Sequence, residues 1–158
     1  MDNPVEVAFS PEGERFLTST FLEQPSAGRR DGLIHMLYGG VYGKIHGVID
    51  SHPRTGGLQP AMTHLGPAAP VGLAYYESAA FGSDYLGNLF ATQFNTRRVG
   101  RHRLVPDGAT FRTEDSDFLV ADSFDFHPTD VAEDADGSLL VVDTGGWYKL
   151  CCPTSQMA

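Results

Sequence analysis

Residues 127–144 read HPTDVAEDADGSLLVVDT, and residues 3–20 read NPVEVAFSPEGERFLTST. When the two stretches are aligned without a gap, several residues of the same type coincide, among them Pro4 with Pro128, Val7 with Val131, Ala8 with Ala132, and Gly13 with Gly137. Each stretch holds a short apolar segment, an acidic turn that ends in glycine, and a second apolar segment. This pattern predicts two strands joined by a tight turn, and its recurrence predicts a repeat protein.

A weaker third copy lies between the two. Residues 70–74 (PVGLA) begin it, residues 88–92 (NLFAT) supply its second apolar segment, and its turn is lengthened to residues 76–87. The copies begin at three prolines roughly sixty residues apart: Pro4, Pro70 and Pro128. Repeats of this order of length are typical of propellers and solenoids. Because a propeller blade cannot bury its own faces, the repeat predicts that further blades belong with this chain.

The composition fits one globular all-β domain. The chain has 158 residues, of which 18 are glycine and 10 are proline, as expected for short strands joined by tight turns. The net charge of −9 argues against a nucleic-acid partner, because such binding depends on clustered Lys and Arg. A neutral or cationic small molecule suits this charge better.

No apolar run is long enough for a transmembrane helix, and the N-terminus lacks the pattern of a signal peptide. The sequence enters a strand directly and stops just after a third unit begins, so we expect a fragment of a longer protein. The two cysteines, Cys151 and Cys152, are neighbours and cannot form a disulfide framework. They are either small half-buried thiols or a strained vicinal pair.

No segment holds a helical period over ten residues. Strands are expected at nine places: residues 5–9, 15–21, 32–38, 71–76, 88–94, 98–105, 110–112, 129–133 and 138–143. Residues 41–70 are expected to form a long loop. The predicted fold is an all-β partial propeller of about two and a half four-stranded blades, in one domain, with units at roughly 1–60, 61–126 and 127–158.

In a propeller, the loop that enters the first strand of each blade and the loop that leaves its second strand emerge at the same face. Three entering loops carry Asn3, His64 and His127, and the exit loops are residues 19–20, 93–98 and 143–148. Their polar and aromatic side chains predict a rim that binds a small molecule or a flat cofactor. The cofactor-binding candidates on it are His64, Asn95, Arg97, Arg98, Asp143, Trp147 and Tyr148.

His127 is the candidate catalytic residue. An imidazole near a carboxylate can serve as a base close to neutral pH, and Asp125 lies two residues away. The alternative is that His127 binds backbone groups and holds the turn between two blades.

The adjacent Arg97 and Arg98 point to opposite sides if they begin a strand. The one that faces the channel could bind a carboxylate or quinone oxygen, and the alternative is an ion pair with an acidic loop. Trp147 and Tyr148 follow Gly145 and Gly146, so they could stack on a flat ring or plug the space between blades.

No metal site is predicted from the residues. The turn at residues 134–137 (DADG) resembles half of a calcium loop but lacks the later glutamate, so a hairpin turn is the favoured interpretation. The spacing of the six histidines does not match a zinc site.

Residues 70–143 carry a series of short motifs in a recognisable order, among them GLAYY, YLGNLFATQFNTRRVGRHRLV, DFLV and HPTDVAEDADGSLLVVD. In that order they resemble the later blades of the glucose/sorbosone dehydrogenase-like propellers. That family includes the PQQ-dependent sugar dehydrogenases and the large "membrane-bound dehydrogenase" relatives of planctomycete-type bacteria. The resemblance covers roughly half of the chain.

The resemblance implies a six-bladed parent with a quinone, PQQ, held over the channel and calcium beneath it. It implies oxidation of a sugar or alcohol, with a histidine base and an arginine that steers the quinone oxygens. Asn95, Arg97 and Arg98 match the family's Asn/Arg-bearing loop, whereas His127 stands where many members have Arg or Lys, and the family's base-bearing histidine has no match here.

We therefore expect part of a quinoprotein-like oxidoreductase. The resemblance also implies a periplasmic or other extracytoplasmic location and a c-type cytochrome as a possible electron acceptor. The alternative is a non-enzymatic propeller that binds a glycan or a protein.

Overall fold

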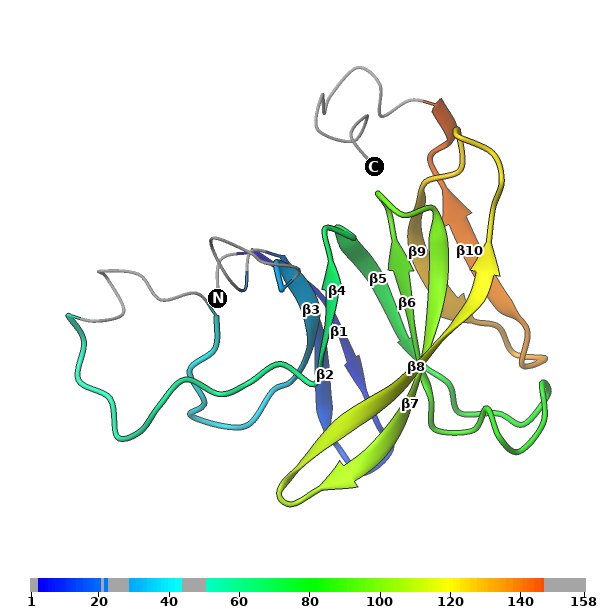
Figure 1. Cartoon of the computed structure of the whole chain (residues 1–158). Coiled ribbons are helices and arrows are strands. Elements are labelled where there is room, and N and C mark those ends of the chain that lie inside the picture. The colour runs from blue at the N-terminus through cyan, green and yellow to red at the C-terminus, as the bar shows by residue number, and fades with distance from the viewer. Residues whose placement is uncertain (1–2, 21, 23–28, 44–50, 147–158) are drawn as a thin grey trace.

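The computed structural model describes residues 3–20, 22, 29–43 and 51–146. They form antiparallel sheets that lie side by side (Figure 1). The described strands are β1 Asn3–Phe9, β2 Arg15–Thr20, β3 Asp31–His35, β4 Thr63–Gly66, β5 Pro70–Tyr75, β6 Leu89–Gln93, β7 Arg98–Asp107, β8 Thr110–Val120, β9 Pro128–Glu133 and β10 Leu139–Asp143. Within these ranges no helix is long and apolar enough to cross a membrane.

Each sheet is built from strands that are consecutive in the chain. The first sheet has the order β1-β2-β3-β4, the second has the order β5-β6-β7-β8, and the third pairs β9 with β10. All pairs between these strands are antiparallel. The prediction of an all-β fold is therefore confirmed.

The sequence repeat has a structural counterpart in the first strand of each sheet. The pairing of β1, β5 and β9 with the following strand is interrupted just after Pro4, Pro70 and Pro128, respectively. A β-bulge of this kind bends a strand and increases its twist. In the first and third sheets, the turn glycines Gly13 and Gly137 both have positive φ, at 86° and 82°. The aligned residues thus occupy equivalent places in successive sheets.

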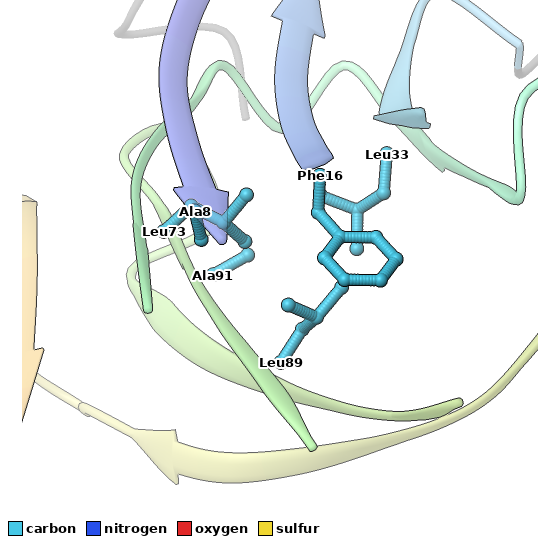
Figure 2. Close-up of a cluster of buried hydrophobic side chains, with 6 residues drawn as sticks. All are labelled: Ala8, Phe16, Leu33, Leu73, Leu89 and Ala91. Atoms are coloured by element: carbon cyan, nitrogen blue, oxygen red, sulfur yellow. The ribbon is translucent and has the colours of Figure 1, made fainter. Parts of the chain in front are cut away.

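An apolar core joins the first sheet to the second. Ala8, Phe16 and Leu33 of the first sheet meet three buried residues of the second, Leu73, Leu89 and Ala91 (Figure 2). The opposite face of the first sheet is covered in part by its own long connection, because Tyr42 and Ala61 pack on Leu17 and Ile34.

The core between the second and third sheets is richer in aromatic residues. Its buried members are Ala74, Tyr76, Phe90, Val99 and Val131. Phe118 lies edge-on to Phe90, with ring centroids 4.8 Å apart. The inner strands approach closely here, because a Cβ on Gly72 would lie 2.5 Å from the Cα of Asp130.

Two strands differ from the sequence prediction. Residues 63–66 form β4, which adds a fourth strand to the first sheet within the expected long loop. β8 is eleven residues long, and it extends well beyond the short strand expected at 110–112. Its hairpin with β7 reaches well beyond the rest of its sheet (Figure 1). Cys151 and Cys152 lie outside the described residues.

Candidate functional site

The turn between β6 and β7, residues 94–97, lies at the centre of the candidate rim. It is fixed to the connection between β4 and β5 by three hydrogen bonds. The backbone N–H of Phe94 donates to the carbonyl of Ala69 (3.2 Å), and that of Asn95 donates to the carbonyl of Ala68 (3.0 Å). The Asn95 side-chain amide donates to the carbonyl of Pro67 (3.2 Å). The loop that enters β5 and the loop that leaves β6 therefore lie side by side at this end of the second sheet.

Two residues of this region have a left-handed backbone although neither is glycine. The φ angle is 47° at Ala69 and 53° at Arg97. Such conformations are uncommon for residues with a Cβ and are found where the surrounding structure enforces them. The carbonyl of Arg97 accepts a hydrogen bond from the N–H of Ala121 (3.2 Å), which ties the turn to the end of β8.

Arg97 extends over an aromatic ring at this edge of the molecule. Its guanidinium carbon lies 4.6 Å from the ring centroid of Phe124, within the range of a cation–π contact. The Phe124 side chain is 72% exposed. A cation and an exposed aromatic ring therefore lie side by side where a ligand could reach both.

Arg98 has a different environment from its neighbour. Its Nη1 atom forms an ion pair with Asp117 of β8 at 2.8 Å, and its Nε donates to the carbonyl of Thr96. Both partners of the ion pair are partly exposed, so it contributes little to stability. Of the two arginines, Arg97 is the one that lies over an aromatic ring at this edge, whereas Arg98 is paired with Asp117.

His127 lies beneath the turn rather than on its surface. Its residue surface is 1% exposed, and its ring packs against Phe94 with centroids 4.7 Å apart. The backbone N–H of His127 donates to Asp143 Oδ1 (2.7 Å), and its carbonyl accepts from the Thr144 hydroxyl (3.3 Å). Asp143 Oδ1 also accepts from the N–H of Gly145 (2.9 Å), so this carboxylate holds the exit loop of the third sheet.

Of the remaining candidates, only His64 is described, and it lies on another strand. His64 lies on the edge strand β4, opposite Gly32, and is exposed. Trp147 and Tyr148 fall outside the described residues. Phe124 belongs to the cluster but is not among the residues predicted from the sequence. A phenylalanine within the acidic segment DSFDF was the available signal.

A second polar cluster links the first two sheets away from the rim. His102 is 1% exposed, and its Nδ1 lies 2.8 Å from Asp115 Oδ1. Thr63 of β4 donates to Asp115 Oδ2 at 2.6 Å. Burial raises the pKa of the Asp115 carboxyl, but the hydrogen bonds from His102 and Thr63 help to outweigh burial and lower it to about 2.

A cleft of about 530 Å³ opens at the opposite end of β6 from the rim. It is lined by Ser83, Asp84, Leu86, Gly87, Asn88, Arg101, Arg103 and Leu104. Arg101 lies over the Tyr85 ring at 3.9 Å and donates to the Asp84 carbonyl, while Arg103 pairs with Glu114. Both guanidiniums are thus engaged within the protein.

No group of three or more His, Cys, Asp or Glu side chains suited to a metal ion occurs among the residues that the structure describes. The described side chains at the rim include a cation, an amide and an aromatic face: Arg97, Asn95 and Phe124.

Several solved structures share the fold. An oxidoreductase (glucose dehydrogenase) from Thermus thermophilus matches with a TM-score of 0.65 and 19% identity, over 91% of this chain and 39% of its own. The PQQ-bound aldose sugar dehydrogenase from Streptomyces coelicolor matches with a TM-score of 0.58 and 17% identity, over 91% and 38%. Another glucose dehydrogenase matches with a TM-score of 0.61 and 17% identity, over 90% and 42%.

The chain thus spans about two fifths of the length of these structures. The prediction of part of a sugar dehydrogenase-like propeller is confirmed at the level of the fold. A search of the curated proteins finds no match. The model of one family, described as a domain of unknown function (DUF7133), matches residues 38–153, and the chain belongs to that family.

Proposed function

We propose that this chain forms part of the cofactor-binding rim of a quinone-dependent dehydrogenase that oxidises a sugar or an alcohol. The observation that carries the proposal is the pairing of Arg97 with the exposed ring of Phe124, at the end of a fold shared with sugar dehydrogenases. The constrained backbone of Arg97 supports the same conclusion, because strain of this kind clusters at functional sites.

PQQ is a flat, anionic quinone, and the rim offers what such a molecule needs. The Arg97 guanidinium can donate two parallel hydrogen bonds to a carboxylate or to adjacent oxygens. Phe124 offers a flat apolar surface beside that cation. Asn95 lies two residues away and supports the turn through its bond to Pro67. These residues fit PQQ, and when bound it would supply the two-electron acceptor for the substrate.

The described residues do not provide a recognisable calcium site. No step of the proposal therefore depends on calcium. The titration with and without CaCl₂, described below, tests whether calcium affects PQQ binding.

The buried position of His127 favours a positioning role over that of a base. A general base must come within hydrogen-bond reach of the proton that it removes, and an imidazole that is 1% exposed does not meet substrate at the surface. His127 instead supports Phe94 and the turn that presents Arg97. The base would then come from another part of the complete enzyme.

Because the buried His127 does not act as a base here, a second candidate function is a propeller module that binds a glycan or a protein without catalysis. An exposed aromatic ring beside a guanidinium can stack on the face of a sugar as well as on a quinone. Under the first proposal, an extracytoplasmic location and a c-type cytochrome acceptor are further proposals that follow from the family resemblance.

Calorimetric titration with PQQ, with and without CaCl₂, tests the proposal. It should be done on the 158-residue chain and on any longer natural polypeptide that contains it. We expect Arg97→Ala to weaken binding at least tenfold and the matched variant Arg98→Ala to leave it within twofold, because Arg98 is paired with Asp117. Absence of PQQ binding in every form, with binding to a glycan array, would favour the non-enzymatic module.

A further inference from the structure

Asp31 is a buried carboxylate for which the proposed function gives no role. It is the first residue of β3, and it is 0% exposed. Its Oδ2 atom accepts a hydrogen bond from the backbone N–H of Ala69 at 2.8 Å, and its Oδ1 atom lies 3.4 Å from Arg30 Nε. Burial of a carboxylate is costly unless the group is paired and hydrogen-bonded, so these contacts constrain both partners strongly.

The backbone partner of Asp31 has an unusual conformation. The φ angle of Ala69 is 47°, in the left-handed region that residues with a Cβ rarely adopt. An ionised carboxylate forms a stronger hydrogen bond with a backbone N–H than a neutral acceptor does. The bond from Ala69 to Asp31 therefore helps to hold Ala69 in a conformation that alanine does not favour by itself.

Ala69 in turn holds the turn at residues 94–97. Its carbonyl accepts a hydrogen bond from the N–H of Phe94 (3.2 Å), at the start of that turn. Arg97 lies three residues further along the chain, with its own positive φ of 53°. A path of two hydrogen bonds thus leads from the Asp31 carboxylate to the turn that presents the guanidinium.

The same turn is supported from the other two sheets as well. At the start of the third sheet, the ring of His127 packs against Phe94 with centroids 4.7 Å apart. Directly after β8 of the second sheet, the N–H of Ala121 donates to the carbonyl of Arg97 (3.2 Å). Asp31 is the support that comes from the first sheet.

We propose that Asp31 is a positioning residue of the rim, which fixes the Arg97 guanidinium in the place where it binds the quinone. Because its side chain is fully buried, Asp31 acts through Ala69 and the turn and does not touch the ligand. The part of this inference that concerns the quinone rests on the proposed function. The effect of Asp31 on the turn does not.

Electrostatics and positioning predict opposite effects of Asp31→Asn on PQQ binding. Removal of a negative charge from the protein should by itself favour an anionic ligand. The neutral amide is a weaker acceptor, however, so the turn should be held less well and binding should weaken. We expect calorimetric titration to show about fivefold weaker binding or more. The matched control Asp117→Asn removes the exposed carboxylate that pairs with Arg98, and it should not weaken binding.

Amide hydrogen exchange, followed by NMR without ligand, tests the path itself. In the unmodified chain, the amides of Ala69 and Phe94 should be protected, because both are hydrogen-bonded. In Asp31→Asn both should exchange about tenfold faster or more, whereas the amide of Phe90 within β6 should be unchanged. Addition of Ala69→Gly to Asp31→Asn should restore the protection of Phe94 and the affinity for PQQ, because glycine adopts a positive φ without help.

The outcomes separate this inference from the proposed function. Unprotected amides at Ala69 and Phe94 in the unmodified chain would overturn the inference, even if Asp31→Asn does not fold. An equal rise in exchange at Phe90, or a double variant that is not restored, would also overturn it, since Asp31 would then only stabilise the fold.

Two further results distinguish the failure of one idea from that of the other. Faster exchange at Ala69 and Phe94 with no PQQ binding in any form would uphold the effect of Asp31 on the turn and overturn the proposed function. PQQ binding that Arg97→Ala weakens and Asp31→Asn leaves unchanged would overturn the inference and leave the proposed function intact.

Discussion

The first and second sheets are joined differently from the second and third. At the first interface, an apolar core is accompanied by side-chain hydrogen bonds across the gap. Thr18 donates to the carbonyl of Val71 (2.8 Å), and His35 lies 3.1 Å from the hydroxyl of Thr110. At the second interface, the rings of Tyr76, Phe90 and Phe118 fill the space, and the Tyr76 hydroxyl donates to the carbonyl of Gly137 (2.6 Å).

The two interfaces therefore combine the same kinds of contact to different extents, since Phe16 also meets the rings of Tyr75 and Phe111 across the first interface. Directional hydrogen bonds fix the position of one sheet on the next, whereas aromatic rings contribute mainly through buried area and ring geometry. The four predictions that follow test this contrast, from the largest expected effect to the smallest.

The largest effect is expected from Phe90→Ala. Phe90 is fully buried and contacts the rings of Tyr76, Tyr85 and Phe118. Its removal should lower the free energy of unfolding by about 3–5 kcal/mol in urea denaturation. Phe124→Ala, at a 72% exposed site, serves as the control and should change stability by no more than about 0.5 kcal/mol. A similar loss in both variants would contradict the importance of ring packing.

Gly72→Ala tests how closely the second and third sheets approach. The added methyl would lie 2.5 Å from the Cα of Asp130, which is backbone and cannot rotate away. We expect a loss of about 1–3 kcal/mol and faster hydrogen exchange at Val131. Gly57→Ala is the control, because nothing lies within 4 Å of its added methyl. An unchanged exchange rate of the Val131 amide would show that the second and third sheets can move apart to admit the methyl group without loss of stability.

Thr18→Val and Tyr76→Phe compare single hydroxyl deletions at the two interfaces. Thr18 Oγ1 donates to Val71 and also accepts from the N–H of Glu6 (3.1 Å), whereas the Tyr76 hydroxyl donates to a carbonyl of the third sheet. We expect losses of about 2 kcal/mol for Thr18→Val and about 1 kcal/mol for Tyr76→Phe, measured by thermal unfolding. The reverse order would show that the polar contacts matter more at the aromatic interface.

The smallest effect concerns pH. The folded pKa of Asp115 is lowered to about 2, below its ordinary value of 3.8, so its ionised form stabilises the fold above about pH 4. This contribution should fall as the pH decreases from about 4 toward 2. Because the side chain is 38% exposed, we expect it to be roughly 1 kcal/mol after allowance for solvent screening.

Asp115→Asn should reduce the slope of stability against pH in that window, as followed by urea denaturation at several pH values. Asp107→Asn, in the β7–β8 turn region, is the comparison variant. An unchanged slope in Asp115→Asn would mean that other carboxyl groups account for the acid sensitivity.

The hairpins of the repeat could be predicted because their signals are local. Alternating apolar residues and a glycine turn define β1–β2 and β9–β10 within about twenty residues of sequence each. The strand β4 could not be predicted in this way, because Thr63–Gly66 is short and becomes a strand through pairing with β3.

The length of β8 has a related explanation. Its central residues, Glu114 to Asp117, are polar and have low strand propensity. They are held in the sheet by partners on β7, where Arg103 pairs with Glu114 and His102 with Asp115. These partners come from a different strand, so a local sequence pattern does not reveal them.

At the candidate rim, the sequence pointed to the turn that bears Asn95 and the two arginines, but it did not distinguish the environments of Arg97 and Arg98. These differ because Arg97 has a positive φ and so departs from the regular alternation of β7. They differ also because Asp117, nineteen positions after Arg98 in the chain, pairs with Arg98 across the hairpin. The burial of His127 depends likewise on Phe94, from a different sheet.

The consecutive order of strands within each sheet has a consequence for folding kinetics. Each hydrogen-bonded pair joins strands that follow one another in the chain, so, apart from the long connection between β3 and β4, the loops closed in forming a sheet are short and their entropic penalty is small. The second sheet, from Pro70 to Val120, packs on a neighbour at both faces. We expect it to form the folding nucleus, with the slowest native-state amide exchange along Leu89–Gln93, and the two outer sheets to add to it as the chain condenses.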